Sequence, residues 1–252
     1  MFKSHDSKNE VKDLNKHKRP EPIQGALQFV EKYFPNCQCA LLAGSVVRGE
    51  ATETSDLDII IFDESKKQSY RESFVEFGWP IEVFVHNFSS YKQFFRNDYQ
   101  RAKPSIQRMV AEGFVLKEDV RLEAIKNEAK QMLAEGPEEW SEETVKIKRY
   151  FITDTLDDFK GCTNRFEGIF IANTLAELLS EFVLRTNRKW TGTSKWRYRS
   201  LKEYDELFAN HFVEAFDCYF QSDNKTKIIN LAANILNPFG GPLFEGFFIG
   251  EK

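Results

Sequence analysis

The first apolar positions of the chain recur at the spacing of one helix face. Apolar residues in 23–34 lie three or four positions apart, which predicts an amphipathic helix that Pro35 ends. Two short apolar runs follow, at residues 39–43 and 57–62. Runs of this length, the second rich in isoleucine, are typical of buried strands. The first part of the chain therefore predicts one helix followed by two strands.

The pattern then changes to alternation. Residues 70–77 and 81–85 alternate between apolar and polar positions on either side of a Gly-Trp-Pro turn, which predicts a β-hairpin. One of the two serines at 89–90 is expected to cap a short aromatic helix that runs through Phe95.

After about residue 118 only helical periodicity is visible. Nothing in this half alternates as a strand does, and Gly-Pro, Gly and Asn-Pro breaks separate the helical stretches. The second half therefore predicts a bundle of helices. The helical stretches are 119–135, 142–160, 166–186, 199–221 and 225–236.

Together these patterns predict an α+β protein, with an N-terminal mixed β-sheet flanked by helices and a C-terminal all-α helical bundle. Residues 1–22 are polar and lack apolar periodicity, so we expect a mobile tail there. The sheet domain is expected over residues 23–117 and the helical domain over residues 118–252.

Composition and charge narrow the class of protein. No apolar run approaches the roughly 18 residues of a membrane span. The amino terminus has no apolar core of a secretory signal, and the four cysteines form no CxxC pair. We therefore expect a cytoplasmic protein with reduced thiols and no membrane partner. The net charge of −4 argues against a large nucleic-acid interface, which needs a basic surface.

Gly44-Ser45 directly follows the strand predicted at 39–43, and a helix is expected to begin there. Glycine lets the backbone approach a ligand closely, and a serine hydroxyl with the free amides of a helix start binds phosphate oxygens. Taken alone, Gly-Ser is more simply a turn.

Three acidic residues follow in positions that are costly without a cation. Asp56 and Asp58 stand two apart at the head of a strand, so they share a face, and Glu82 stands among apolar residues of a later strand. Two carboxylates about 4 Å apart repel by roughly 4 kcal/mol at an effective dielectric near 20. Each acid alone has a plain alternative as a turn, a cap or an edge-strand charge. Together they predict a magnesium site, because hard oxygen ligands favour that ion.

This combination resembles the motif of the DNA polymerase β-like nucleotidyltransferase superfamily: Gly44-Ser45, ten intervening residues, Asp56-x-Asp58, and Glu82 in the third acidic position. Within the superfamily the chain is most similar to bacterial antibiotic nucleotidyltransferases of the kanamycin, streptomycin and lincosamide kind, which also carry a helical second domain. The resemblance implies that the three acids are catalytic and hold magnesium, with Glu82 as general base. It also implies that residues 23–117 are the catalytic domain and 118–252 the substrate-binding domain.

Two basic residues are candidates for contact with the nucleotide. Arg48 lies one turn past Ser45 and either reaches the phosphates or is a solvated helix charge. The segment 192–196 is similar to a stretch of the antibiotic nucleotidyltransferases in which a lysine meets the triphosphate, and this implies that role for Lys195. The alternative for the basic, aromatic cluster around Lys195 is an amphipathic loop between helices.

The favoured function is transfer of a nucleoside monophosphate from ATP or another nucleoside triphosphate to a hydroxyl of a small-molecule acceptor, with release of pyrophosphate and with two Mg²⁺ ions. Asp154, Asp157 and Asp158 either recognise a cationic acceptor or form a solvated helix face. Antibiotic modification is one role that the resemblance implies. The alternatives are a protein-modifying regulator of the toxin–antitoxin type and a nonenzymatic descendant that binds nucleotide.

Overall fold

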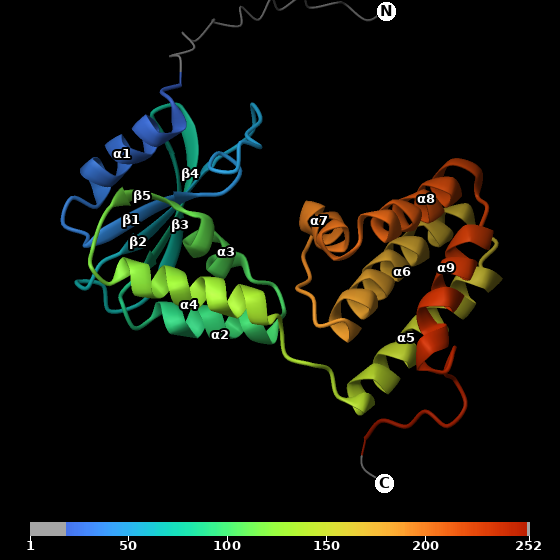
Figure 1. Cartoon of the computed structure of the whole chain (residues 1–252). Coiled ribbons are helices and arrows are strands. Elements are labelled where there is room, and N and C mark those ends of the chain that lie inside the picture. Colours follow the sequence, from blue (N-terminus) through green and yellow to red (C-terminus); the bar gives the residue numbers. More distant parts are fainter. Residues whose placement is uncertain (1–18, 251–252) are drawn as a thin grey trace, which may run out of the picture. The chain divides into compact units, whose positions relative to one another are not determined.

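The computed structural model describes residues 19–250, which form two compact units (Figure 1). The first unit runs to Phe94 and resumes over Ile106–Lys130. The second unit consists of Phe95–Ser105 and the chain from Gln131 onward. The two units are therefore interleaved along the sequence.

The tail expected at residues 1–22 lies mostly outside the described residues, which begin at Arg19. Its last residues are part of the fold. Pro22 is the first residue of helix α1 (Pro22–Tyr33), where its missing N–H leaves no helical hydrogen bond unmade. The indole N–H of Trp79 donates to the carbonyl oxygen of Pro20 at 2.9 Å, and this bond fixes the approach to the helix.

The first unit is built on a five-stranded mixed sheet with the strand order β3-β4-β2-β1-β5. Strands β2 and β4 are parallel, and the other neighbouring pairs are antiparallel. The first two strands and the hairpin predicted from the sequence are confirmed. The strands are β1 (Cys39–Ala43), β2 (Leu57–Phe62), β3 (Tyr70–Glu76), β4 (Trp79–His86) and β5 (Phe114–Lys117).

Side chains of β2 and β4 alternate between the two faces of this sheet. Leu57, Ile59 and Ile61 are fully buried in a core that also contains residues of α1. Asp58 stands on the opposite face, because successive strand residues point to opposite sides. In the parallel ladder Asp58 is paired directly with Glu82 of β4. The register of these two strands therefore brings two carboxylates side by side.

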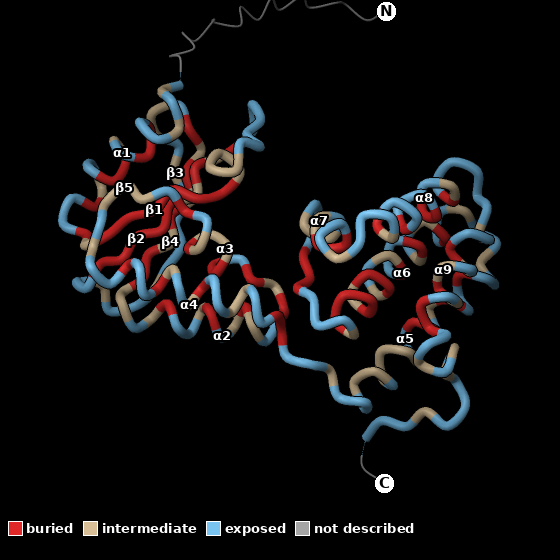
Figure 2. The backbone as a smooth tube through the Cα atoms, viewed as in Figure 1, coloured by how far each residue is buried: buried red, intermediate tan, exposed pale blue. Residues whose placement is uncertain are grey.

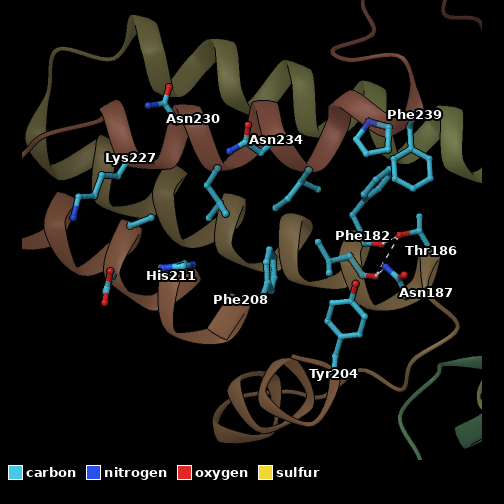
Figure 3. A pocket seen from close by; sticks show the side chains of 16 residues that line it. Phe182, Thr186, Asn187, Tyr204, Phe208, His211, Lys227, Asn230, Asn234 and Phe239 are labelled. Carbon is cyan, nitrogen blue, oxygen red and sulfur yellow. Dashed lines mark hydrogen bonds between the residues drawn. The ribbon is translucent and has the colours of Figure 1, made fainter. Parts of the chain in front are cut away.

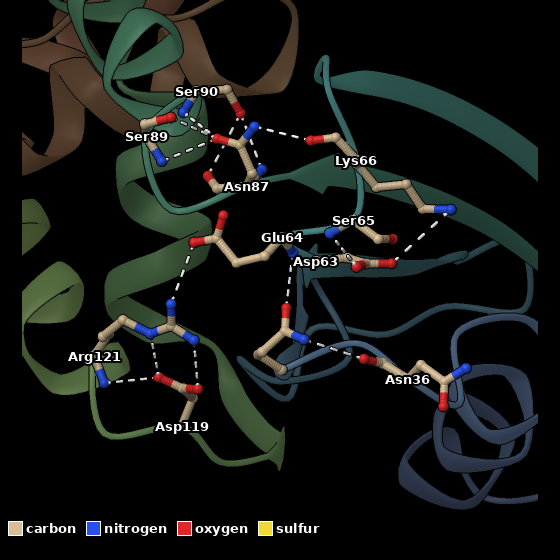
Figure 4. A network of polar contacts seen from close by, with 11 residues as sticks. Asn36, Asp63, Glu64, Ser65, Lys66, Asn87, Ser89, Ser90, Asp119 and Arg121 are labelled. Atoms are coloured by element: carbon tan, nitrogen blue, oxygen red, sulfur yellow. Dashed lines mark hydrogen bonds and ion pairs between the residues drawn. The ribbon is translucent and has the colours of Figure 1, made fainter.

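Polar contacts fix the other end of the same two strands (Figure 4). The amide side chain of Asn87, directly after β4, accepts from the backbone N–H of Ser90 at 2.7 Å and donates to the carbonyl oxygen of Lys66 at 2.9 Å. Arg121 binds Glu64, which follows β2, at 3.2 Å. The loops that leave β2 and β4 are thereby joined to each other and to the segment before helix α4 (Leu122–Glu135).

The helices α1 and α4 lie on opposite sides of the sheet (Figure 1). Helix α2 (Tyr91–Gln100) continues five residues beyond the expected end at Phe95, so that prediction was too short. Helix α3 (Ser105–Glu112) and strand β5 were not predicted, and α4 spans Leu122–Glu135. β5 ends where the domain boundary is expected, and that boundary stays a prediction.

The second unit is all helical and packs around one buried core, seen as red inward-facing segments in Figure 2. The helix expected over 199–221 is two helices. The carboxylate of Asp205 accepts from the N–H of Phe208 at 2.9 Å and so starts a new helix there. The predicted α+β class is confirmed. The helices are α5 (Glu142–Gly161), α6 (Arg165–Thr186), α7 (Lys195–Tyr204), α8 (Glu206–Ser222), α9 (Thr226–Leu236) and the 3₁₀ turn η1 (Asn237–Phe239).

Backbone and side-chain hydrogen bonds attach the segment Phe95–Ser105 to the second unit. The carbonyl oxygen of Ala102 accepts from the N–H of Thr191 at 2.8 Å and from its hydroxyl at 3.0 Å. Within residues 19–250, none of the helices combines the length and the apolar character that crossing a membrane requires.

Candidate active site

Three carboxylates converge at the start of the parallel strand pair. Asp56 precedes β2 by one residue, Asp58 is the second residue of β2, and Glu82 is paired with Asp58 across the ladder. One carboxylate oxygen from each residue lies within 4.8 Å of those of the other two. In the described part of the chain this is the one group of three or more acidic, histidine or cysteine residues that converges in this way.

The electrostatics of this cluster disfavour the charged form of Asp58. Burial, and then the negative charges of Asp56 and Glu82, raise the pKa of Asp58 to about 6. The guanidinium groups of Arg48 and Arg71 oppose this shift and do not cancel it. A carboxylate in these surroundings is held in its charged form only at a free-energy cost, which a bound cation would remove.

The donor set fits a hard divalent cation. Carboxylate oxygens are the ligands that Mg²⁺ prefers, and one or two protein carboxylates with substrate phosphates is its usual arrangement in phosphoryl-transfer sites. All three residues are half-buried, so water and a ligand retain access to them. Asp56, Asp58 and Glu82 are therefore the residues that would hold the metal.

Gly44 lies against this cluster. It has a left-handed φ of +80°, and a Cβ built on it would lie 2.1 Å from Oδ2 of Asp58. The prediction that a helix begins at Gly44-Ser45 is wrong: residues 45–49 form a turn, closed by a hydrogen bond of 2.9 Å from the N–H of Glu50 to the carbonyl oxygen of Ser45. Glycine is needed here for its backbone angle and for the space that the carboxylate occupies.

Ser45 links this turn to the loop before β2. Its hydroxyl donates to Oγ of Ser55 at 3.1 Å, and the same Oγ accepts from the N–H of Thr52 at 2.8 Å. Ser55 is buried and directly precedes Asp56. The contact therefore positions the first acid of the cluster, and sequence reasoning did not identify Ser55.

Two arginines lie near the acids. Arg48, a predicted phosphate ligand, forms ion pairs with Glu50 and Glu112, both at 3.2 Å. Arg71 of β3 pairs with Glu82, and sequence reasoning missed it. The alternation of residues 70–77 was the signal that could have found Arg71, because it places this side chain on the same sheet face as Ser73, which is paired with Glu82.

Lys195, the other predicted nucleotide contact, belongs to the second unit. It is exposed and is the first residue of α7. Gly192 packs against this first turn so closely that a Cβ on it would lie 2.5 Å from Cβ of Trp196. Residues 192–194 thus form a loop that leads into α7 at Lys195. Contact between Lys195 and a triphosphate stays a prediction.

A comparison with protein families agrees with this geometry. The family model described as "Nucleotidyltransferase domain" matches residues 23–147. A search of curated proteins finds no match. Among solved structures, the chain is similar to a nucleotidyltransferase-like protein from Exiguobacterium sibiricum 255-15, with 11% identity and a TM-score of 0.43 over 86% of this chain and 73% of that one. Residues 23–147 thus belong to the nucleotidyltransferase domain family of the DNA polymerase β-like superfamily.

Proposed function

We propose that the protein transfers a nucleoside monophosphate from ATP, or another nucleoside triphosphate, to a hydroxyl of a small-molecule acceptor. The observation that carries this proposal is the convergence of Asp56, Asp58 and Glu82 within 4.8 Å beside Gly44. The match of residues 23–147 to a nucleotidyltransferase domain supports transfer in general. The identities of the nucleotide and of the acceptor are part of the proposal.

Each residue of the cluster has a proposed role. Asp56 and Asp58, together with Glu82, would hold Mg²⁺. The metal, when bound, neutralises the charge that develops on the phosphate oxygens. Glu82 accepts the proton of the acceptor hydroxyl, whose oxygen forms a bond to the α-phosphorus while the bond from that phosphorus to the pyrophosphate oxygen breaks.

Arg71 is proposed to exchange partners during this reaction. In the absence of nucleotide it pairs with Glu82 and keeps one carboxylate of the cluster partly neutralised. Its side chain is 56% exposed, so it is free to turn toward a phosphate. A planar guanidinium suits that role because it binds two phosphate oxygens at once.

In this proposal the acceptor is a small molecule, and the protein acts in the cytoplasm. The net charge of −4 supports an acceptor other than nucleic acid. Asp154 and Asp158 are exposed on α5, as expected for the solvated helix face that was the simpler alternative to a cationic-acceptor site. Modification of an antibiotic remains one form of this proposal.

The experiment is a screen of acceptors with α-³²P-labelled ATP and Mg²⁺, in which transfer of label and release of pyrophosphate are both measured. Wild-type protein is expected to label at least one hydroxyl compound, and the Asp58→Asn variant is expected to label none. The opposite outcome is that ATP and Mg²⁺ stabilise the wild type against heat, yet neither a small molecule nor a protein is labelled. The chain would then be a nucleotide-binding protein, and the transfer proposal would fail.

A further inference from the structure

A pocket of about 750 Å³ lies within the second unit (Figure 3). Residues of α6, α8 and α9 line it, and η1 and Tyr204 at the end of α7 contribute to it as well. All of these residues belong to one compact unit, so the pocket is independent of the acidic cluster in the first unit. Its volume falls within the range of about 300–1,000 Å³ that is typical of sites for small molecules.

One end of the pocket is aromatic. Phe182 and Phe239 meet edge to face, with ring centroids 5.0 Å apart and an interplanar angle of 84°. Figure 3 shows these two rings together, with Phe208 of α8 lining the opposite wall. Aromatic walls of this kind offer ring edges and faces to a flat, apolar molecule. The apolar end therefore favours an aromatic or fused-ring body.

The wall formed by α9 is polar. Lys227, Asn230 and Asn234 are spaced three and four residues apart, so they share one helix face, and all three are exposed. In residues 19–250 no hydrogen bond or ion pair to any of these three side chains occurs. Two amide groups, each able to donate and to accept, thus face the pocket with their capacity unused.

The charges at the pocket balance. Lys227 of α9 is opposed by Glu214 of α8, which lines the same pocket. A ligand with a net charge of either sign would meet one group of like charge. The lining therefore favours a neutral molecule over an anion or a cation. It also disfavours a strongly basic molecule of the kind that the exposed acids of α5 would attract.

We propose that this pocket binds a neutral small molecule with an aromatic or fused-ring body and with carbonyl, amide or hydroxyl groups along one edge. The ring body lies against Phe182, Phe208 and Phe239, and the polar edge is bound by Asn230 and Asn234. The pocket is open to solvent along the polar wall, so the ligand enters between α8 and α9.

The test uses prodan, a neutral naphthalene dye with one ketone oxygen, whose fluorescence shifts to the blue in apolar surroundings. Wild-type full-length protein is expected to bind it saturably at one site. The Asn234→Trp variant, which places a large ring at the edge of the pocket, should weaken binding at least about tenfold, a loss of 1.4 kcal/mol. Asn230→Ala should weaken it about fivefold through one lost hydrogen bond.

The matched control is Asn210→Trp, the same substitution at an exposed position of α8 that does not line the pocket. It should bind prodan as the wild type does, and circular dichroism should show the same helix content in all variants. Equal affinity of Asn234→Trp and wild type, or no saturable binding to wild type, would overturn the proposal. So would sedimentation showing a wild-type dimer that Asn234→Trp dissociates, because the pocket would then be a contact between two copies.

Discussion

Gly44 and Asp58 fit against each other so closely that position 44 has no room for a side chain while the Asp58 carboxylate keeps its place. A Cβ on Gly44 would lie 2.1 Å from Oδ2 of Asp58 and 3.0 Å from its Cγ. The glycine was predicted to make room for phosphate. Its contact in the structure is with a carboxylate of the cluster, so its effect on the proposed nucleotide site is expected to come through the position of Asp58.

Gly44→Ala is expected to abolish stabilisation by ATP and Mg²⁺, because the new methyl group displaces Asp58. Gly49→Ala is the matched control: Gly49 also has a left-handed φ, +72°, but no atom lies within 4 Å of a Cβ built there. Both variants should lose about 1 kcal/mol of stability from backbone strain. A thermal shift with ligand that is equal in the two variants would contradict the role assigned to Gly44.

Asp58→Asn is expected to stabilise the metal-free protein at pH 8. The pKa of Asp58 in the folded state, about 6, lies above its ordinary value of 3.8. The folded state therefore binds the proton more tightly, and the unfolding free energy of the wild type falls as pH rises from about 4 to 6. Urea denaturation in EDTA should show the variant more stable by on the order of 1 kcal/mol at pH 8, and nearly equal to wild type at pH 4.

Addition of Mg²⁺ should reverse this order. The metal stabilises the wild type by binding to the charged carboxylates, and the neutral amide of the variant offers a poorer ligand. If wild type and Asp58→Asn gain equal stability from Mg²⁺ with ATP, the acidic cluster does not hold the metal.

Glu82→Gln should lower the rate of nucleotide transfer at least about a hundredfold, since the amide cannot accept a proton. The control is Glu72→Gln on the adjacent strand. Glu72 is paired with Val83, a buried residue of the α1 side of the sheet, so it stands on the other face from Glu82. The measurement is the single-turnover rate with labelled ATP, which should fall in Glu82→Gln and stay at the wild-type value in Glu72→Gln. An unchanged rate for Glu82→Gln would show that a group other than Glu82 accepts the proton of the substrate hydroxyl.

His86 should make the fold sensitive to acid. Burial lowers its pKa to about 4, from 6.5, and its Nδ1 lies 2.9 Å from the hydroxyl of Ser69. Because the folded-state pKa is depressed, the unfolded chain binds the proton first as pH falls. Stability is then full above pH 6.5 and declines by up to about 3 kcal/mol between pH 6.5 and 4.

The His86→Phe variant removes this decline, although it loses the hydrogen bond to Ser69 at every pH. The quantity to measure is the difference in unfolding free energy between variant and wild type, because Asp58 contributes a slope of the opposite sign in the same pH range. A difference that does not change between pH 7 and 4 would show that the pKa of His86 is the same in the folded and the unfolded chain, and that burial does not lower it.

The sequence was informative where apolar periodicity is strong. β1 and β2 have the bounds that their apolar runs predict, because every residue of β1 is buried and only Asp58 interrupts burial in β2. β5 escaped prediction because it is a four-residue edge strand, without a buried residue, whose conformation depends on pairing with β1.

The sequence predicted the three acids of the site, but it did not predict Ser55 and Arg71, which contact residues of the site. Asp56, Asp58 and Glu82 follow from spacing on strands, and the structure brings them together. Ser55 and Arg71 act through contacts across the chain, to Ser45 and Glu82, that no local pattern specifies. The sequence alone does not distinguish a turn from a helix start at Gly44-Ser45, because Gly-Ser is compatible with both. The tertiary contact of Gly44 with Asp58 is specific to the turn.

The direct pairing of Asp58 with Glu82 would couple the proposed activity to correct folding. If β4 slipped by one residue along β2, Glu82 would move to the other face of the sheet, among the apolar residues packed against α1. A mispaired chain would then bury an uncompensated charge and unfold, instead of persisting as a compact but inactive protein. Natural selection against inactive molecules and natural selection against misfolded molecules would therefore both preserve the same register of β2 and β4.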